Sequence, residues 1–317
     1  MQHFWSLDQV YLKNAWLTIG SYDGVHLGHQ AIIRQLIDGA HEVNCPAVVV
    51  TFHPHPATVL RGRGGQFYLT SPEEQASLLG DMGVDVLITH PFNEEISKMS
   101  AYDFITEMDQ HLDISHLWVG HDFTLGRDRE GDIPTLQKLG ESFGYQLNIV
   151  DPIKFEGGVV SSSVIRAALA NGDMEIAREL LGRPYQVDGI VIPGDGRGST
   201  FGIPTANLDV WSKKALPKVG VYVCRAVIDG KIWGAVTNIG VRPTFDANKL
   251  SPRIEAHLLN FNENIYGKTM SVFFITRLRD EKRFSNTQSL VNQIHLDIHA
   301  AEAILKSEAE KFIGDRA

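Results

Sequence analysis

The sequence predicts an α/β domain with a parallel sheet, followed by a small antiparallel β-barrel and a long C-terminal helix. Its 317 residues are enough for two hydrophobic cores. Short apolar runs alternate with helical patterns in the first half, whereas strand-like runs follow one another in the second. The pattern changes near Arg183 and Pro184, which places the expected domains at residues 1–184 and 185–317.

The first domain is expected to hold a parallel sheet. Its strands are the apolar runs at residues 15–20, 47–52, 84–90, 117–120 and 147–150. A helix is expected to start after Ser71, because Ser71 and Glu74 form a capping box around a proline that suits the first helical position. Ligands of such folds bind at the carboxyl ends of the strands. The site is therefore expected in the loops after Ile19, Phe52 and Gly120.

The second half has the spacing of an all-β domain. Its strand-like runs are residues 186–192, 221–228, 232–240, 254–261 and 270–278, and breaks containing Gly, Pro or Asn separate them. Residues 285–288 form a capping-box pattern that predicts the start of the final helix at Ser285. An apolar stripe at helical period follows, made of Leu290, Val291, Ile294, Ile298, Ala301, Ile304 and Leu305.

Composition argues against several classes of protein. The formal net charge of -9 leaves no basic excess for a nucleic-acid backbone. No run reaches the roughly 18 apolar residues of a membrane span, and the first residues show no apolar signal segment. The two cysteines, Cys45 and Cys224, lack metal-binding spacing and fit a reducing compartment. We therefore expect a cytoplasmic protein without nucleic-acid or membrane partners; the sequence leaves open whether it is a monomer or associates weakly with itself.

The stretch GSYDGVHLGH, residues 20–29, lies where the first strand meets the first helix. His26 and His29 stand three apart, so both lie on one face of the first helical turn. Unpaired N–H groups and the positive end of the helix dipole attract anions there, and Gly28 leaves room for a phosphate. Spacing alone leaves three interpretations open: a phosphate site, a metal site completed by histidines of residues 51–56, or structural histidines.

These ten residues resemble the HxGH nucleotidyltransferase signature, in the longer form found in bacterial bifunctional riboflavin kinase/FAD synthetases. Four further stretches are similar to motifs of that family in the same order: TFHPHP at 51–56, VGHDFTLGRDREG at 119–131, SSSVIRAAL at 161–169 and GDGRGSTFGIPTANL at 194–208. Five matches in order, across most of the chain, make the resemblance specific. Tyr22 departs from the family, which usually has Phe there, and Ser199 stands where a second Arg is common.

The resemblance implies adenylyl transfer in the first domain. The phosphate of FMN attacks the α-phosphorus of ATP, pyrophosphate leaves and FAD forms. His26, His29 and Arg166 are implied as the catalytic residues that hold ATP phosphates. Further ATP-binding residues are implied at Gly20, Tyr22, Asp23, Gly28, Asp122, Ser161, Ser162 and Ser163. From the residues alone, the serine run and Arg166 fit an N-cap and a solvated arginine equally well.

The glycine-rich loop of the second domain is neither a P-loop nor a dinucleotide fingerprint, because no GK[ST] closes it and no βαβ unit surrounds it. Its N–H groups can surround phosphates, and its composition also fits an ordinary flexible hairpin. The resemblance implies that ATP of a riboflavin kinase is bound by Gly194, Gly196, Gly198, Gly202, Thr205 and Asn207. Thr205 and Asn207 face the same side of an extended segment, and their oxygens suit Mg²⁺ carried by ATP phosphates.

Glu255 is the candidate base of the kinase. It stands within an apolar strand-like run, where a charge is costly unless the side chain points outward. The resemblance implies that it activates the 5′-hydroxyl of riboflavin. The implied enzyme uses ATP and Mg²⁺ to convert riboflavin to FMN and FMN to FAD. The alternatives are an enzyme with one active site, a flavin-binding sensor without turnover, and a zinc hydrolase built on His26, His29, His53 and His55.

Overall fold

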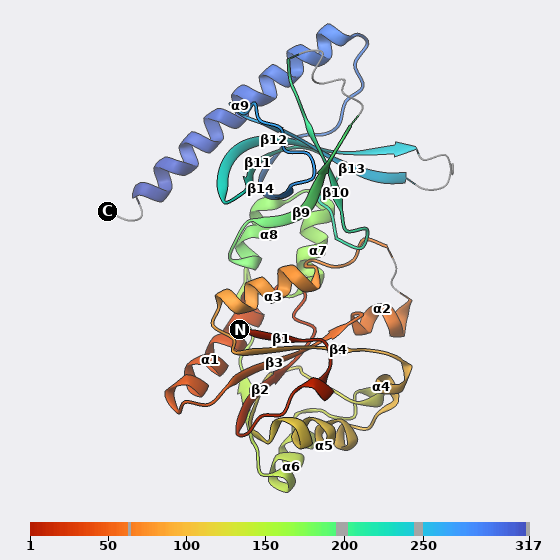
Figure 1. The fold of residues 1–317 in the computed structure, drawn as a ribbon, viewed down its shortest axis with the longest axis vertical. Helices are drawn as coiled ribbons and strands as arrows, with labels where there is room; N and C mark the ends of the chain where they lie inside the picture. The colour runs from red at the N-terminus through yellow and green to blue at the C-terminus, as the bar shows by residue number, and fades with distance from the viewer. Residues whose placement is uncertain (63–64, 195–201, 244–249, 315–317) are drawn as a thin grey trace. The chain divides into compact units, whose positions relative to one another are not determined.

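The computed structural model describes residues 1–62, 65–194, 202–243 and 250–314. Its contacts divide the chain into two compact units, Met1–Ser162 and Ser163–Ala317 (Figure 1). Within the described residues, no helix combines the length and the apolar character that a membrane crossing requires. Helix α8, Met174–Leu181, belongs to the second unit by this division. A functional boundary at residue 184 stays a prediction.

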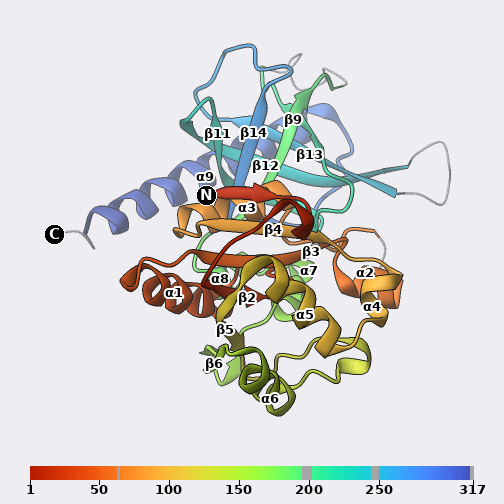
Figure 2. The same cartoon turned by 60° about the horizontal axis from the view of Figure 1, so that its bottom comes forward.

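The first unit contains a six-stranded parallel sheet in the order β1-β4-β3-β2-β5-β6, which Figure 2 shows. The strands are β1 Gln2–Phe4, β2 Ala15–Ile19, β3 Ala47–His53, β4 Val86–Pro91, β5 Ile114–Gly120 and β6 Gln146–Val150. The helices are α1 Leu27–Glu42, α2 Pro56–Arg61, α3 Pro72–Asp81, α4 Glu94–Lys98, α5 Ala101–Leu112 and α6 Ile133–Phe143. A short hairpin, β7 Lys154–Phe155 and β8 Gly158–Val159, precedes α7, Ser162–Asn171. The predicted parallel sheet is confirmed.

The sheet is buried on both faces, as its continuous apolar strands predict. Alternate residues of β3 serve different cores: Val49 packs in a cluster with residues of α1 and α3, and Val48 and Val50 pack in a cluster with residues of α5 and α6. The predicted capping box of α3 is present, since Ser71 Oγ accepts from the backbone N–H of Glu74 at 3.1 Å and Glu74 Oε2 accepts from that of Ser71 at 2.8 Å.

The chain changes direction across the sheet at β2. Strands β3 and β4 lie on one side of β2, and β5 and β6 lie on the other. Such a reversal opens a crevice at the carboxyl end of the central strand, where ligands of open α/β sheets bind. Residues 20–26, which join β2 to α1, start at this point. The fold therefore places the histidine-containing loop where a ligand is expected.

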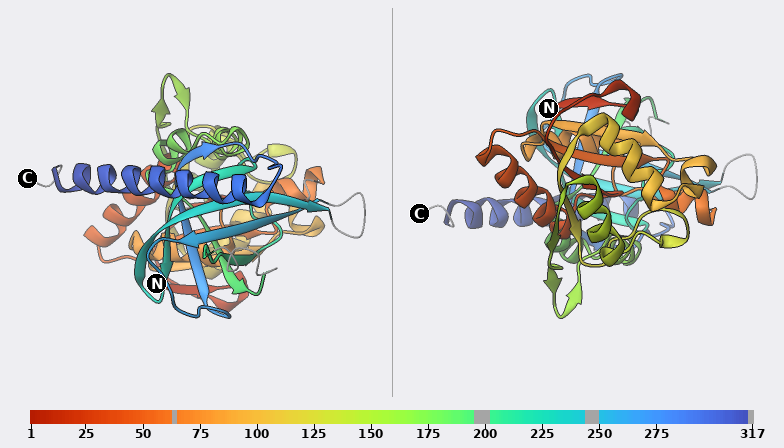
Figure 3. Two further views of the ribbon diagram at one scale, coloured as in Figure 1. Left: turned by 90° about the horizontal axis from the view of Figure 1, so that it is seen from above. Right: turned by 90° about the horizontal axis from the view of Figure 1, so that it is seen from below.

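The second unit contains a closed antiparallel barrel in the order β10-β13-β12-β11-β14-β9. Its strands are β9 Tyr185–Ile192, β10 Ala206–Val210, β11 Gly220–Ile228, β12 Lys231–Pro243, β13 Leu250–Leu258 and β14 Thr269–Arg279. The predicted barrel is thus confirmed. The final helix, α9, Thr287–Gly314, packs along the outside of the barrel against β12 and β11 (Figure 3).

Helix α9 is attached to the barrel by its apolar stripe and by ion pairs. Ala301 is buried, and Ile298, Ile304 and Leu305 pack with it against side chains of β11, β12 and β14. The predicted Ser285 cap is wrong: the helix begins at Thr287, and Asn286 Oδ1 accepts from the backbone N–H of Ser289 at 2.8 Å. Asparagine is as good an N-cap as serine, so the sequence offered two candidates one residue apart.

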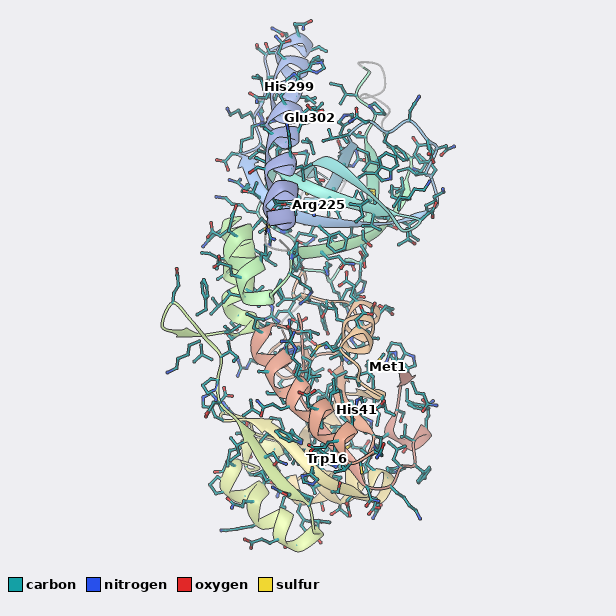
Figure 4. The ribbon with its side chains drawn as sticks, turned by 90° about the vertical axis from the view of Figure 1, so that its left-hand side faces the viewer. Met1, Trp16, His41, Arg225, His299 and Glu302 are labelled. Carbon is teal, nitrogen blue, oxygen red and sulfur yellow. The ribbon has the colours of Figure 1, made fainter. Side chains whose placement is uncertain are left out.

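Two arginines of the barrel reach carboxylates of α9. Arg279 and Asp297 form a nearly buried pair with Nη2–Oδ2 at 2.7 Å and Nε–Oδ1 at 2.9 Å. Arg225 of β11 lies beside α9, where its Nη2 is 3.8 Å from Glu308 Oε2 (Figure 4). The pair at Asp297 is the stronger attachment, because its charges are shielded from water and bonded in two places.

Candidate functional site

Buried polar contacts fix the loop between β2 and α1. Asp23 is buried, and its Oδ1 accepts from the backbone N–H groups of Leu69 at 2.9 Å and Thr70 at 3.1 Å. The carbonyl oxygen of Asp23 accepts from Ser162 Oγ at 2.9 Å. Two predicted site residues, Asp23 and Ser162, therefore tie the histidine loop to other segments of the first unit.

His26 is the N-cap of α1. Its Nδ1 accepts from the backbone N–H of His29 at 3.3 Å, and the two imidazoles are stacked with their centroids 3.6 Å apart. Since Nδ1 is an acceptor, neutral His26 carries its proton on Nε2 and can donate from there. Gly28 makes room for this ring: a Cβ there would lie 3.1 Å from Cε1 of His26.

His29 lies between the His26 ring and Tyr22. Burial lowers the pKa of His29 well below its ordinary value, and the nearby imidazoles of His26 and His55 lower it further. The ring is therefore neutral near pH 7. Its Nδ1 is buried and has no hydrogen-bond partner among the residues that the structure describes. His26 and His29, when neutral, therefore each carry one imidazole N–H group next to the first turn of α1.

Tyr22 supports His29 from the side. The two rings meet edge to face at 5.0 Å, and Gly20 lies against the tyrosine ring, where a Cβ would be 2.9 Å away. The Tyr22 hydroxyl is 2.5 Å from Thr18 Oγ1, which donates to the Trp118 carbonyl at 2.7 Å. Thr18 thus accepts from Tyr22. Phenylalanine, which the family usually has at this position, lacks this hydroxyl. In this chain the Tyr22 hydroxyl bonds to Thr18 of β2, and Thr18 bonds to the backbone of β5 at Trp118.

The remaining predicted residues of this site are Asp122, Ser161, Ser163 and Arg166. Asp122, after β5, keeps 82% of its side chain exposed, and its Oδ1 is 3.8 Å from His121 Nδ1. Ser161 precedes α7 in the first unit. Ser163 and Arg166 lie on α7 and belong to the second unit.

A small hollow lies where the sequence predicts a site, at the loops that follow β2 and β3. Its wall includes the aromatic rings of Phe52 and Tyr68 together with His53 and His55. His55 caps α2, with its Nδ1 accepting from the backbone N–H of Ala57 at 3.0 Å. Within the described ranges, no three His, Cys, Asp or Glu side chains gather where they could hold a metal. The zinc interpretation therefore has no support there.

The barrel brings the predicted kinase residues together. Glu255 of β13 pairs in register with Asn207 of β10 on one side and with Asn238 of β12 on the other. Its neighbours Ile254 and Ala256 are buried in the barrel, so Glu255 faces outward, as one interpretation of the sequence expected. The carboxylate is 32% exposed, and its Oε1 lies 3.3 Å from Nη1 of Arg253.

Asn207 is the most enclosed residue of this group. It is 6% exposed, and Gly194 lies directly on its side chain, since a Cβ at Gly194 would be only 2.0 Å from Nδ2. Asn207 Oδ1 is buried without a hydrogen-bond partner among the described residues. A buried acceptor without a partner costs about 1–3 kcal/mol. This oxygen therefore fits a ligand position for a hard cation.

A surface opening lies next to Thr205. Its wall is largely apolar and includes Val191, Leu258, Phe261 and Tyr266. Such a lining, with few polar groups at its edge, is typical of sites for planar rings. Gly202, in the same loop, has a left-handed φ of +73°. The predicted residues Gly196 and Gly198 lie outside the part of the chain that the structure describes.

The two sites define a class of protein: an ATP-dependent transferase with an HxGH-type nucleotidyltransferase unit and a barrel with an outward glutamate. Residues 8–164 match the family model described as FAD synthetase, and residues 181–305 match the model described as riboflavin kinase. The bifunctional riboflavin kinase/FMN adenylyltransferase of Bacillus subtilis is 37% identical over 284 residues, covering 89% of each chain. That of Pseudomonas fluorescens is 37% identical over 295 residues, covering 93% of this chain and 94% of its own.

The chain belongs to the bifunctional riboflavin kinase/FMN adenylyltransferase family. It is an enzyme that phosphorylates riboflavin to FMN and adenylylates FMN to FAD. A crystal structure from Streptococcus pneumoniae, described as a macrolide-efflux protein, superposes with a TM-score of 0.85 at 29% identity and covers 95% of this chain and 98% of its own. The name of that protein refers to efflux, whereas both family models and the relatives from Bacillus subtilis and Pseudomonas fluorescens are named for flavin chemistry.

Proposed function

We propose that the two sites described above carry out the two steps, and that both use ATP with Mg²⁺. The observation that carries the kinase assignment is the alignment of Asn207, Glu255 and Asn238 on neighbouring strands of the barrel. Among the described residues, the buried amide oxygen of Asn207 has no hydrogen-bond partner, and the side chain of Glu255 faces outward. A metal ligand and a base are the two groups that phosphorylation of a hydroxyl requires.

In the kinase step, Glu255 accepts the proton of the riboflavin 5′-hydroxyl as that oxygen attacks the γ-phosphorus of ATP, the bond to the β-phosphate oxygen breaks and ADP leaves. Thr205 and Asn207 hold Mg²⁺, which neutralises charge on the ATP phosphates when bound. The apolar opening beside Thr205 takes the adenine ring. Arg253 stays next to Glu255 and restricts where its carboxylate points.

In the adenylyl step, His26 donates Nε2–H to an ATP phosphate, and neutral His29 contributes a second N–H. Ser161, immediately before α7, adds a hydroxyl donor. Asp23 and Ser162 keep the loop in place through their mutual contact. Because no covalent intermediate is required, these residues act by orienting the FMN phosphate and ATP and by stabilising charge.

The rings of Phe52 and Tyr68, in the wall of the hollow, offer surfaces on which a planar ring of one substrate of the adenylyl step can stack. We place the enzyme in the cytoplasm, because Cys45 and Cys224 are both free thiols, which suits a reducing compartment. The functional boundary lies at residue 184, immediately before β9 opens the barrel.

The assay supplies purified protein with riboflavin and Mg-ATP and separates flavins by chromatography over time. The proposal expects FMN first, then FAD, and neither product when a chelator removes Mg²⁺. FAD formed only from supplied FMN would indicate one active site and refute the kinase half. Tight flavin binding without ATP consumption would indicate a sensor and refute both halves.

A further inference from the structure

Glu255 is one of three outward residues that alternate along β13, with Arg253 before it and His257 after it. The intervening side chains, Ile254 and Ala256, are buried, and so is Leu258, which follows His257. Glu255 has a proposed role as the base, and Arg253 is its ion-pair partner. His257 has a separate contact, which points toward the ATP-binding segment.

The pairing of β10 with β13 stops at Ala206, which lies opposite Ala256. Beyond that point a side chain continues the connection: His257 Nδ1 lies 2.8 Å from the carbonyl oxygen of Pro204. A carbonyl oxygen can only accept, so the imidazole donates Nδ1–H. Pro204 has no N–H of its own to offer a neighbouring strand. The imidazole therefore fastens the backbone immediately before Thr205.

We propose that His257 is a positioning residue of the kinase site, whose Nδ1–H holds the Pro204 carbonyl and thereby fixes Thr205 for Mg-ATP. The inference rests on the proposed roles of Thr205 and Asn207. Asn207 is already fixed by the β10–β13 rung with Glu255. Thr205 lies outside that pairing and borders the opening proposed for adenine. Holding it in place before ATP arrives removes an ordering cost from nucleotide binding.

His257→Ala removes the donor. A neutral hydrogen bond is worth about 1 kcal/mol, so the KM for Mg-ATP in FMN formation should rise about fivefold. The kcat should stay within about twofold, because Glu255 and its pairing are untouched, and FAD formation from supplied FMN should not change. Titration calorimetry with Mg²⁺ and a non-hydrolysable ATP analogue, in the presence of riboflavin, should show the same loss of affinity without relying on turnover.

His257→Asn is the rescue variant, because its carboxamide N–H can reach the same carbonyl. Its KM for Mg-ATP should lie within about twofold of the unchanged protein, and the measurement stands even if His257→Ala fails to fold. His299→Ala is the matched control: that imidazole lies on α9 with 76% of its side chain exposed (Figure 4). The control should leave both parameters unchanged.

Thr205→Ala separates the inference from the function on which it rests. If Thr205→Ala raises the KM and His257→Ala does not, the positioning role is wrong and the proposed ATP site stands. If neither change raises the KM, the proposed role of Thr205 is wrong and the inference falls with it. If His257→Asn is as impaired as His257→Ala, the ring itself is required, and positioning through the Pro204 carbonyl is refuted.

Discussion

Replacing Gly28 with alanine perturbs the start of α1 at one atom. The new Cβ would lie 3.1 Å from Cε1 and 3.2 Å from Nδ1 of His26. Favourable contacts of this kind lie at about 3.5–4.0 Å, so the imidazole has to move. It is held by the cap bond to the His29 backbone and by stacking on the His29 ring. Moving the ring weakens one or both of these contacts.

The expected effects on stability nearly cancel. Losing the cap costs about 1 kcal/mol, whereas alanine is favoured over glycine in a helix by about 1 kcal/mol. The free energy of unfolding should therefore change by less than about 1 kcal/mol. The adenylyl step loses a donor to a charged phosphate, worth about 1.5–3 kcal/mol, so FAD formation should fall about 10- to 150-fold.

The assay measures FAD formed from FMN and FMN formed from riboflavin, together with urea unfolding. Gly80→Ala, on helix α3, is the matched control, because the nearest atoms to its Cβ would be those of Met1, at an ordinary contact distance of 3.6 Å or more. The control should keep both activities. Full FAD formation by Gly28→Ala would refute the proposed role of the His26 ring, and equal loss of both activities would show a general folding defect instead.

Three further predictions concern stability and the support of His29. Asp297→Ala leaves Arg279 without its nearly buried partner and should lower the free energy of unfolding of the barrel by about 3 kcal/mol in urea; an unchanged midpoint would contradict this. The folded-state pKa of His29 lies below its unfolded value of 6.5, so below pH 6.5 the unfolded chain binds a proton that the folded chain refuses. Stability should therefore fall as the pH falls from 6.5 toward the folded-state pKa, and less steeply in His29→Asn; equal slopes in urea unfolding would refute the neutral buried ring. Tyr22→Phe keeps the ring against His29 but removes the hydroxyl bonded to Thr18, and should cost about 1 kcal/mol in urea with FAD formation within about threefold; a larger loss of activity would show that the hydroxyl serves the reaction.

The parallel sheet and the barrel were predictable because their strands are long enough to show a pattern. Strand β3, with five buried residues in a row, is recognisable from Ala47 onward. The three residues of β1 are too few for any periodicity, and β10, Ala206–Val210, carries polar residues that do not form an apolar run. Both depend on their neighbours in the sheet, which the local sequence does not reveal.

The histidine pair was predictable as a pair, since residues three apart on a helix are neighbours. Its capping bond and the room that Gly28 leaves were not, because they depend on the rotamer of His26. In the barrel, Asn207 and Glu255 were each expected in the kinase site from family motifs. That they share one rung follows from the register of β10 and β13, and so does the bond from His257 to Pro204.

The central claim is that one chain carries two separate sites for two steps. Glu255→Gln and His29→Asn, each supplied with Mg-ATP and either riboflavin or FMN, test it in one chromatographic assay. Glu255→Gln should form no FMN from riboflavin yet make FAD from FMN at the unchanged rate. His29→Asn should form FMN normally and lose FAD formation. Loss of both products by either variant would contradict two separate sites.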